Sequence, residues 1–221
     1  MNPRTPLFPR LAISVLLAAL ILPACDWAGL RGNGVITTEN RSMADFSAID
    51  ASGAYKIIWS PGSPALSVTC DQNLLNEVTA TVADGKLRIR TRERVRPTHG
   101  IRIVISSQTL TGVRMRGALD LKASKVATSN FFLESDGASD VILDGTVDSL
   151  TARLRGAGDL NAESLQAKSV EVSLMGAADA KVNATESLSV SIKGAGDVRY
   201  SGNPKTIKKS VAGAGSVRPK K

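Results

Sequence analysis

The sequence has few of the residues that most active sites use. Among 221 residues there is one histidine, His99, and there are two cysteines, Cys25 and Cys70. Aromatic residues make up 4% of the chain, and one of its two tryptophans, Trp27, precedes the predicted folded part. Sugar-cleaving sites use paired carboxylates, or a metal with a base, together with aromatic platforms. The composition therefore argues against an enzyme, and we predict no catalytic residue, no metal site and no cofactor.

The scarcity of aromatics also restricts the core. Hydrophobic residues make up 43% of the chain, which is enough for a core. Because few of them are aromatic, the interior must be built from small and β-branched aliphatics, which favours thin, regularly layered β-structure. The formal net charge is +8 and the isoelectric point is about 9.8. That balance suits contact with an anionic lipid or glycan. Arginines do not interleave with aromatics, so nucleic acid is not an expected partner.

The first 25 residues have the features of an export signal. Arg4 and Arg10 precede an apolar run of twelve residues, 11–22. The run is shorter than the ~20 residues that span a bilayer. It ends in the residues LPAC, which resemble the lipobox of bacterial lipoproteins and imply lipid attachment at Cys25. The alternatives are an uncleaved anchor and a conventional signal peptide.

Four parts follow from this interpretation: a signal peptide (1–24), a lipidated linker (25–33), a β-helical head (34–217) and a basic tail (218–221). Loss of two arginines with the signal leaves a formal charge of 8 − 2 = +6. The lipid would hold the head at a membrane of the cell envelope, and the sequence leaves open which membrane. Cys70 then has no partner and is predicted to be a buried small hydrophobe.

Short Gly-Ala motifs recur along the second half of the chain. They are GALD at Gly117, GASD at Gly137, GAGD at Gly156, GAAD at Gly176, GAGD at Gly194 and GAGS at Gly213. The intervals are 20, 19, 20, 18 and 19 residues, and an earlier relative, GAYK, begins at Gly53. Self-similarity at a fixed period is the signature of a repeat architecture.

Apolar and polar residues alternate on both sides of each motif, which is the period of a strand and not of a helix. The fourth residue after the motif glycine is apolar in every repeat: Leu121, Val141, Leu160, Ala180, Val198 and Val217. Recurring strands can stack in parallel, each covering the apolar face of the one before. The sequence predicts an all-β fold, namely a parallel β-helix or solenoid with coils of about 19 residues and a more irregular N-terminal β cap.

Charged residues before the motifs fit this register. The third and first residues before the motif glycine are basic in one repeat, acidic in the next and basic in the third: Arg114 and Arg116, Glu134 and Asp136, Arg153 and Arg155. If equivalent positions stack, the two acids lie between two pairs of arginines. Exposed pairs contribute only about 0–1 kcal/mol each. The alternative interpretation is an arginine-lined anion site.

The motif glycines are predicted to turn corners at positive φ, where the backbone passes close to neighbouring coils. A dinucleotide-binding loop is excluded, because it needs a single G-x-G-x-x-G between a strand and a helix. The motif acids are Asp120, Asp140, Asp159, Asp179 and Asp197. Stacked carboxylates repel by about 1 kcal/mol per pair in water. We predict that they accept backbone N–H bonds at the corners, and the alternative is a ladder of bound cations.

The N-terminal half predicts less regular strands. They are 54–59, 66–70, 77–82, 86–90 and 101–105, and Asp84-Gly85 is a strong signal for a two-residue hairpin. Residues 71–77 predict a helical turn capped by Asp71. His99 lies in a polar segment and is predicted to be a surface residue.

These features together resemble the auto-transporter adhesin head domain known as the GIN domain. The matching stretches are GNG, FSAIDASGAYKIIW, LSVTCDQNLLNEV, ADGKLRIR, the serial GAGD corners and SGNPKTIKKSVAGAGSV, which cover nearly all of residues 33–217. The resemblance implies a parallel β-helix-like head exported to the bacterial envelope. It implies no catalytic residues.

The leading hypothesis is a non-enzymatic, lipid-anchored envelope protein that presents a rigid surface to an anionic glycan or an envelope protein. One alternative is a structural protein that assembles with copies of itself. The other is a polysaccharide-active β-helix enzyme. Fold alone does not decide between these functions.

Overall fold

The computed structural model describes residues 29–220. The predicted signal peptide, the lipid attachment at Cys25, the first part of the linker and the last residue of the basic tail lie outside these described residues. Within them the chain is almost entirely β-structure, with one short 3-10 helix. The prediction of an all-β fold is confirmed. No helix in this part of the chain has the length and apolar character that a bilayer span requires.

In chain order, the elements of residues 29–220 are β1 (Leu30–Arg31), β2 (Ile36–Ser42), β3 (Ala48–Pro61), β4 (Ala65–Asp71), a 3-10 helix (Gln72–Glu77), β5 (Val78–Ala83), β6 (Lys86–Thr91), β7 (Val95–Arg96), β8 (Arg102–Ser107), β9 (Gly112–Gly202) and β10 (Thr206–Pro219).

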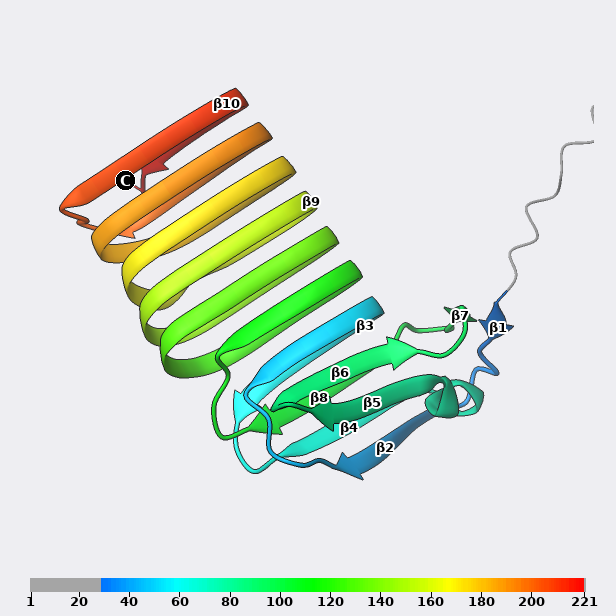
Figure 1. Cartoon of the computed structure of the whole chain (residues 1–221). Coiled ribbons are helices and arrows are strands. Elements are labelled where there is room, and N and C mark those ends of the chain that lie inside the picture. The colour runs from blue at the N-terminus through cyan, green and yellow to red at the C-terminus, as the bar shows by residue number, and fades with distance from the viewer. Residues whose placement is uncertain (1–28, 221) are drawn as a thin grey trace, which may run out of the picture.

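One continuous sheet path connects most of these strands, in the order β10-β9-β3-β8-β4-β2. The pairs β10–β9, β9–β3 and β3–β8 are parallel, whereas β8–β4 and β4–β2 are antiparallel. The first part of β3 also pairs in parallel with β6, and β6 forms an antiparallel hairpin with β5. Strand β3 therefore joins the regular part of the molecule to the irregular N-terminal part (Figure 1).

Strand β9 is 91 residues long because its pairing continues through its bends. Figure 1 shows it winding back and forth, so that successive stretches lie side by side. We call each stretch between equivalent motif residues a pass. Motif lies beside motif: Gly53 of β3 pairs with Gly117, and Gly213 of β10 pairs with Gly194. The ladder places equivalent repeat positions next to one another, as the repeat period predicts.

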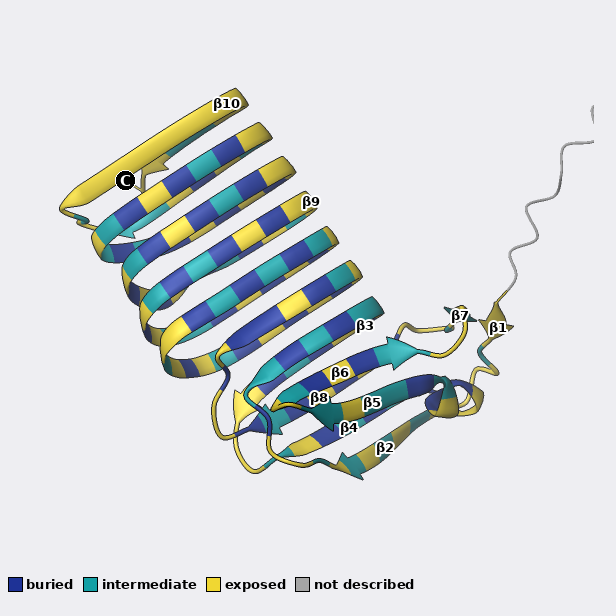
Figure 2. Ribbon diagram, viewed as in Figure 1, coloured by how far each residue is buried: buried dark blue, intermediate teal, exposed yellow. Residues whose placement is uncertain are grey.

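The core is a column of aliphatic side chains on the inner side of the passes. The predicted inward positions Leu121, Val141, Leu160, Ala180 and Val198 are each at most 2% exposed. Buried and exposed residues alternate along the passes of β9, as Figure 2 shows. The predicted alternation is confirmed in these passes. The last pass differs, because Val217 is only half-buried.

The corner at Gly156 shows why the motifs require glycine. Its φ is +116°, a backbone conformation that L side chains rarely adopt. A Cβ added there would overlap the carbonyl oxygen of Gly137 on the preceding pass. The other five motif glycines of β9 and β10 also have positive φ: Gly117, Gly137, Gly176, Gly194 and Gly213. The predicted positive-φ corner is confirmed, with close approach of backbone as a second cause.

The N-terminal part contains the predicted strands, which correspond to β3, β4, β5, β6 and β8; those predicted at 77–82 and 101–105 begin one residue before β5 and β8. Asp84 and Gly85 have φ values of 53° and 66° between the paired residues Ala83 and Lys86, so the two-residue hairpin is confirmed. Cys70 is 1% exposed, as predicted. His99 is exposed, as predicted.

The predicted cap of the helical turn is wrong. Residues 72–77 do form a 3-10 helix, but the side chain of Asp71 makes no capping hydrogen bond to it. The carboxylate instead accepts hydrogen bonds from the N–H of Gly34 at 2.8 Å and from the N–H and hydroxyl of Thr98 at 2.9 and 2.8 Å. These donors come from segments distant in sequence, so Asp71 joins two loops to the end of β4.

Candidate functional site

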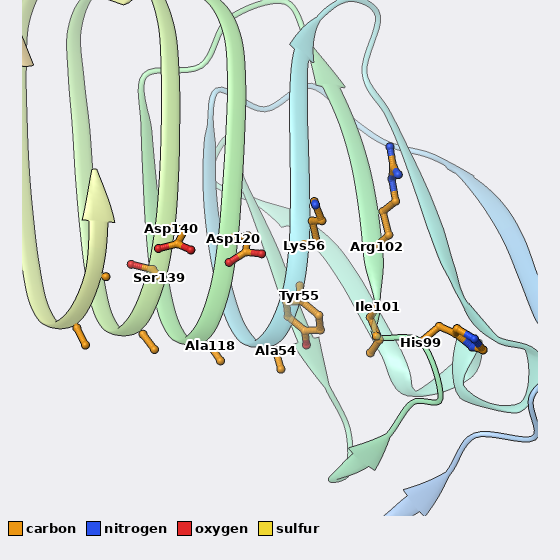
Figure 3. A pocket seen from close by; sticks show the side chains of 14 residues that line it. Ala54, Tyr55, Lys56, His99, Ile101, Arg102, Ala118, Asp120, Ser139 and Asp140 are labelled. Carbon is orange, nitrogen blue, oxygen red and sulfur yellow. The ribbon is translucent and has the colours of Figure 1, made fainter. Parts of the chain in front are cut away.

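A groove of about 710 Å³ lies where the regular passes meet the N-terminal part. One wall is formed by the corners of four adjacent passes, and the other by the segment 99–102 that leads into β8. Figure 3 shows the labelled side chains on these two walls. The backbone N–H of Lys56 donates to the carbonyl of Ile101 at 2.9 Å, which ties the walls together at the base.

The corner wall of the groove is lined by alanine. The residue after each motif glycine is exposed, and the groove uses four of these residues: Ala54, Ala118, Ala138 and Ala157. They form one column, because Ala54 pairs with Ala118 and the later motifs continue the same ladder. Adjacent strands are only about 4.8 Å apart. Small side chains at this spacing leave a smooth, weakly apolar strip.

Charged groups flank this strip. Lys56 lies between Asp120 and Arg102 on the neighbouring strands of the ladder, and Asp140 follows on the next pass. His99 lies at the outer end of the second wall, where its Nδ1 is 2.9 Å from the hydroxyl of Thr98. The groove therefore offers cationic donors at one end and carboxylate acceptors beside them.

Tyr55 also lines the groove and carries an unusual hydroxyl. The residue is 4% exposed, and its hydroxyl has no partner in hydrogen-bonding geometry among the described residues. Burial raises the pKa of the phenol, and the nearby Thr91 hydroxyl and Arg90 charge offset part of this rise. A buried hydroxyl without a partner costs about 1–3 kcal/mol.

The predicted charge pattern appears on the outer face before the corner. Glu134 lies between two arginines: one oxygen is 2.8 Å from Arg114 and the other is 3.1 Å from Arg155. Arg155 also contacts Asp136 at 3.3 Å. Hydrogen bonding by Asp136, followed by the charge of Glu134, raises the pKa of the Arg155 guanidinium. Residues of three successive passes are thus brought together.

Two members of the predicted pattern have other contacts. The expected partner of Arg153 is Glu134, but both oxygens of that carboxylate already contact other arginines. The guanidinium of Arg153 instead lies over the ring of Phe132, 5.7 Å from its centre. Arg116 contacts Asp50 of the preceding pass at 3.0 Å, and Arg90 approaches that carboxylate at 3.1 Å. Asp50 is 14% exposed, so salt screens this pairing less than it would screen a pair of fully exposed side chains. The expectation that four arginines surround two acids is corrected accordingly.

The motif acids occupy the outer face after the corner. Two of them, Asp120 and Asp140, line the alanine groove. A second groove, of about 430 Å³, contains Asp140, Asp159, Asp179 and Asp197. Asp179 accepts the N–H of Asp197 at 2.7 Å, and Asp197 accepts the hydroxyl and the N–H of Ser216 at 2.6 and 2.9 Å. The hydroxyl bond is the main reason that the pKa of Asp197 is lowered.

These bonds connect a motif acid to the equivalent position of the next pass. At two of the five motifs, therefore, the acid accepts a backbone N–H, as predicted. Within residues 29–220, no group of three or more His, Cys, Asp or Glu side chains is arranged to hold a metal ion.

Sequence reasoning missed the alanine groove and the Asp71 contacts. The alanines were visible as the second letter of every motif, but the second wall depends on how residues 99–102 pack beside β3. Burial alone would raise the pKa of Asp71; the hydrogen bonds from Thr98 and Gly34 lower it instead. No local sequence pattern predicts these contacts, because their donors lie 27 and 37 residues away.

The fold and these grooves define a class: an all-β protein whose outer surface repeats from pass to pass and is hollowed along its corners. The chain belongs to a family whose model matches residues 45–204 and is described as "Putative auto-transporter adhesin, head GIN domain". The family resemblance seen in the sequence is confirmed.

Solved structures with a similar fold include two from the genera Bacteroides and Parabacteroides. A "putative adhesin" from Bacteroides fragilis NCTC 9343 is 25% identical, with a TM-score of 0.72 over 87% of this chain and 100% of its own. A "putative lipid binding protein" from Parabacteroides distasonis ATCC 8503 is 23% identical, with a TM-score of 0.51 over 88% of this chain and 100% of its own, and shows the fold alone. No curated protein matches the chain.

Proposed function

We propose that this chain is a non-enzymatic, lipid-anchored envelope protein that uses a rigid head for adhesion or ligand binding. The head is a parallel β-solenoid with coils of about 19 residues, as the motif intervals and the parallel pairing of β3, β9 and β10 support. Membership of the adhesin-head family supports the binding role and the envelope location.

The observation that carries this proposal is the alanine groove. Its wall consists of equivalent residues from four passes, so it runs across the strands and suits an extended ligand. The backbone beneath it is paired on both sides and turns at glycines that pack on backbone, which makes the groove preformed. A preformed groove loses little conformational entropy on binding.

The charges of the groove favour an anionic glycan as the ligand. Lys56 and Arg102 can donate hydrogen bonds to the carboxylate or sulfate of a sugar. Asp120 and Asp140 can accept hydrogen bonds from its hydroxyl groups. The alanine strip offers flat contact to the ring faces of the sugar.

The test is a binding screen of the full chain, purified in detergent, against a panel of envelope glycans at low and at physiological salt. Ala138→Gln fills the groove without changing the net charge, and Ala195→Gln makes the same change in the same column outside it. We expect saturable binding at physiological salt that is lost in the first variant and kept in the second. Binding that disappears with salt, or that survives in both variants, contradicts the proposal.

The anchor is tested separately. Cys25→Ser removes the predicted lipid site, so the variant should leave the detergent phase on phase partitioning, while the wild-type chain stays in it. An unchanged partition would refute the lipoprotein part of the proposal and leave the groove unaffected.

A further inference from the structure

Strand β10 is an open edge. It is the last strand of the sheet path and pairs only with β9 among the described strands. The pairing extends over its whole length of 14 residues, so a row of backbone N–H and C=O groups of similar length remains on its other side. Figure 1 shows β10 at the end of the molecule opposite β1, where the chain enters the described part.

The inner face of β10 is also uncovered. Ile207 and Val211 pair with Leu188 and Ile192, which are 1% exposed in the preceding pass. In β10 the two side chains are 38% and 43% exposed, since no further pass of residues 29–220 covers them. Figure 2 shows nearly the whole strand as exposed.

The excess positive charge of the chain is concentrated at this edge. Residues 202–220 contain five lysines and arginines and no acid, and one of the five, Lys220, is paired with Glu163 at 2.9 Å. Lys209 takes the position that Val190 fills in the preceding pass. Its Nζ donates to the carbonyl of Val217 at 2.9 Å and lies 5.5 Å from the centre of the Tyr200 ring, so the cation reaches across the open end.

These charges decide what can pair with the edge. A second copy of the chain joined through the same edge would bring Lys208, Lys209 and Arg218 of the two β10 strands together. Inward-facing lysines and edge charges are the means by which sheet proteins avoid that association. A partner with the opposite charge meets attraction instead of repulsion.

We propose that β10 is a docking edge for an extended acidic peptide segment of another protein, which adds to the sheet as a further strand. Backbone hydrogen bonds to the open side of β10 would supply affinity. Alternate apolar residues of the segment would cover Ile207 and Val211, and its acidic residues would face lysines such as Lys208. A polysaccharide has no regular row of amides to satisfy this edge. The inference is independent of the glycan groove, which lies at the opposite end of the stack of passes, beside the N-terminal part.

The test measures binding of a fluorescent ten-residue peptide of alternating glutamate and valine to the full chain in detergent. A peptide of the same sequence with every backbone amide N-methylated has the same charge but can donate no backbone hydrogen bond to the edge. Lys208→Glu places an acid on the edge, and Lys122→Glu makes the same charge change on an exposed residue of the first pass of β9. Hydrogen exchange of β10 is followed with and without peptide.

We expect saturable binding at physiological salt, slower exchange of β10 amides, and about tenfold weaker binding of both the methylated peptide and the Lys208→Glu chain. Lys122→Glu should bind as the wild type does. Equal binding of the methylated peptide would show a surface for polyanions in general and overturn the proposal. So would equal losses in the two lysine variants, protection of β10 by self-association without peptide, or no binding.

Discussion

Replacement of Gly156 by alanine tests how the passes are held together. The residue has a φ of +116°, and an added Cβ would overlap the carbonyl oxygen of Gly137. A positive φ costs an L-residue about 1–2 kcal/mol. Displacement of the adjacent backbone adds about 1–3 kcal/mol, as overpacking does in cores. The free energy of unfolding should therefore fall by about 2–5 kcal/mol. Urea unfolding followed by circular dichroism measures this fall.

A matched variant separates the two causes. Gly85 also has a positive φ, of +66°, but a Cβ added there meets nothing within 4 Å. Gly85→Ala should cost only the conformational part, about 1–2 kcal/mol. If Gly156→Ala costs no more than Gly85→Ala, then the corner glycines do not pack on the preceding pass, and the close approach of passes is refuted.

Three further predictions concern single side chains. Tyr55→Phe removes a buried hydroxyl without a partner and should leave the unfolding free energy unchanged or raise it by up to about 2 kcal/mol; a loss above about 1 kcal/mol would mean that the hydroxyl is hydrogen-bonded. Asp71→Asn should cost about 1.5–3 kcal/mol near neutral pH. Because the folded pKa of Asp71 is lowered, its stabilisation is present above the unfolded pKa, about 3.9, and is lost as pH falls through the folded value. The difference between the variant and the wild type should therefore shrink as the pH is lowered below about 3.9, and a constant difference across pH would contradict this reasoning. Glu134→Gln should cost at most about 1 kcal/mol, with the difference shrinking in 1 M salt; a larger, salt-independent loss would argue against exposed ion pairing.

The regular part of the fold could be predicted because each of its signals is local and repeated. The alternation of apolar and polar residues around Leu121 and Val141 identifies strands, and motif glycines such as Gly156 and Gly176 identify corners. Their spacing predicts the register seen between β3, β9 and β10. Periodicity supplies long-range information that a non-repeating sequence does not contain.

The remaining features depend on contacts that no period encodes. The partner of Arg116 is Asp50, and that of Arg153 is a ring, because competition among neighbouring charges decides which oxygens are free. The bonds of Asp71 come from two distant loops, so a residue with the sequence signature of a helix cap has another role. The second wall of the groove is set by residues 99–102, where the sequence predicts a polar segment at His99 and the start of a strand at Ile101, but not that these residues lie beside β3.

The central claim is that equivalent positions of successive passes lie side by side, since both proposed binding surfaces depend on it. The direct test is disulfide formation in the full chain with Ala54→Cys and Ala118→Cys, two exposed and paired positions. Adjacent strands hold such residues within the Cα–Cα range of about 4.4–6.8 Å that a disulfide spans. Mild oxidation should join them within one chain, whereas the pair Ala54→Cys and Ala195→Cys should not join. Failure of the first pair, or equal joining of the second, would contradict the register.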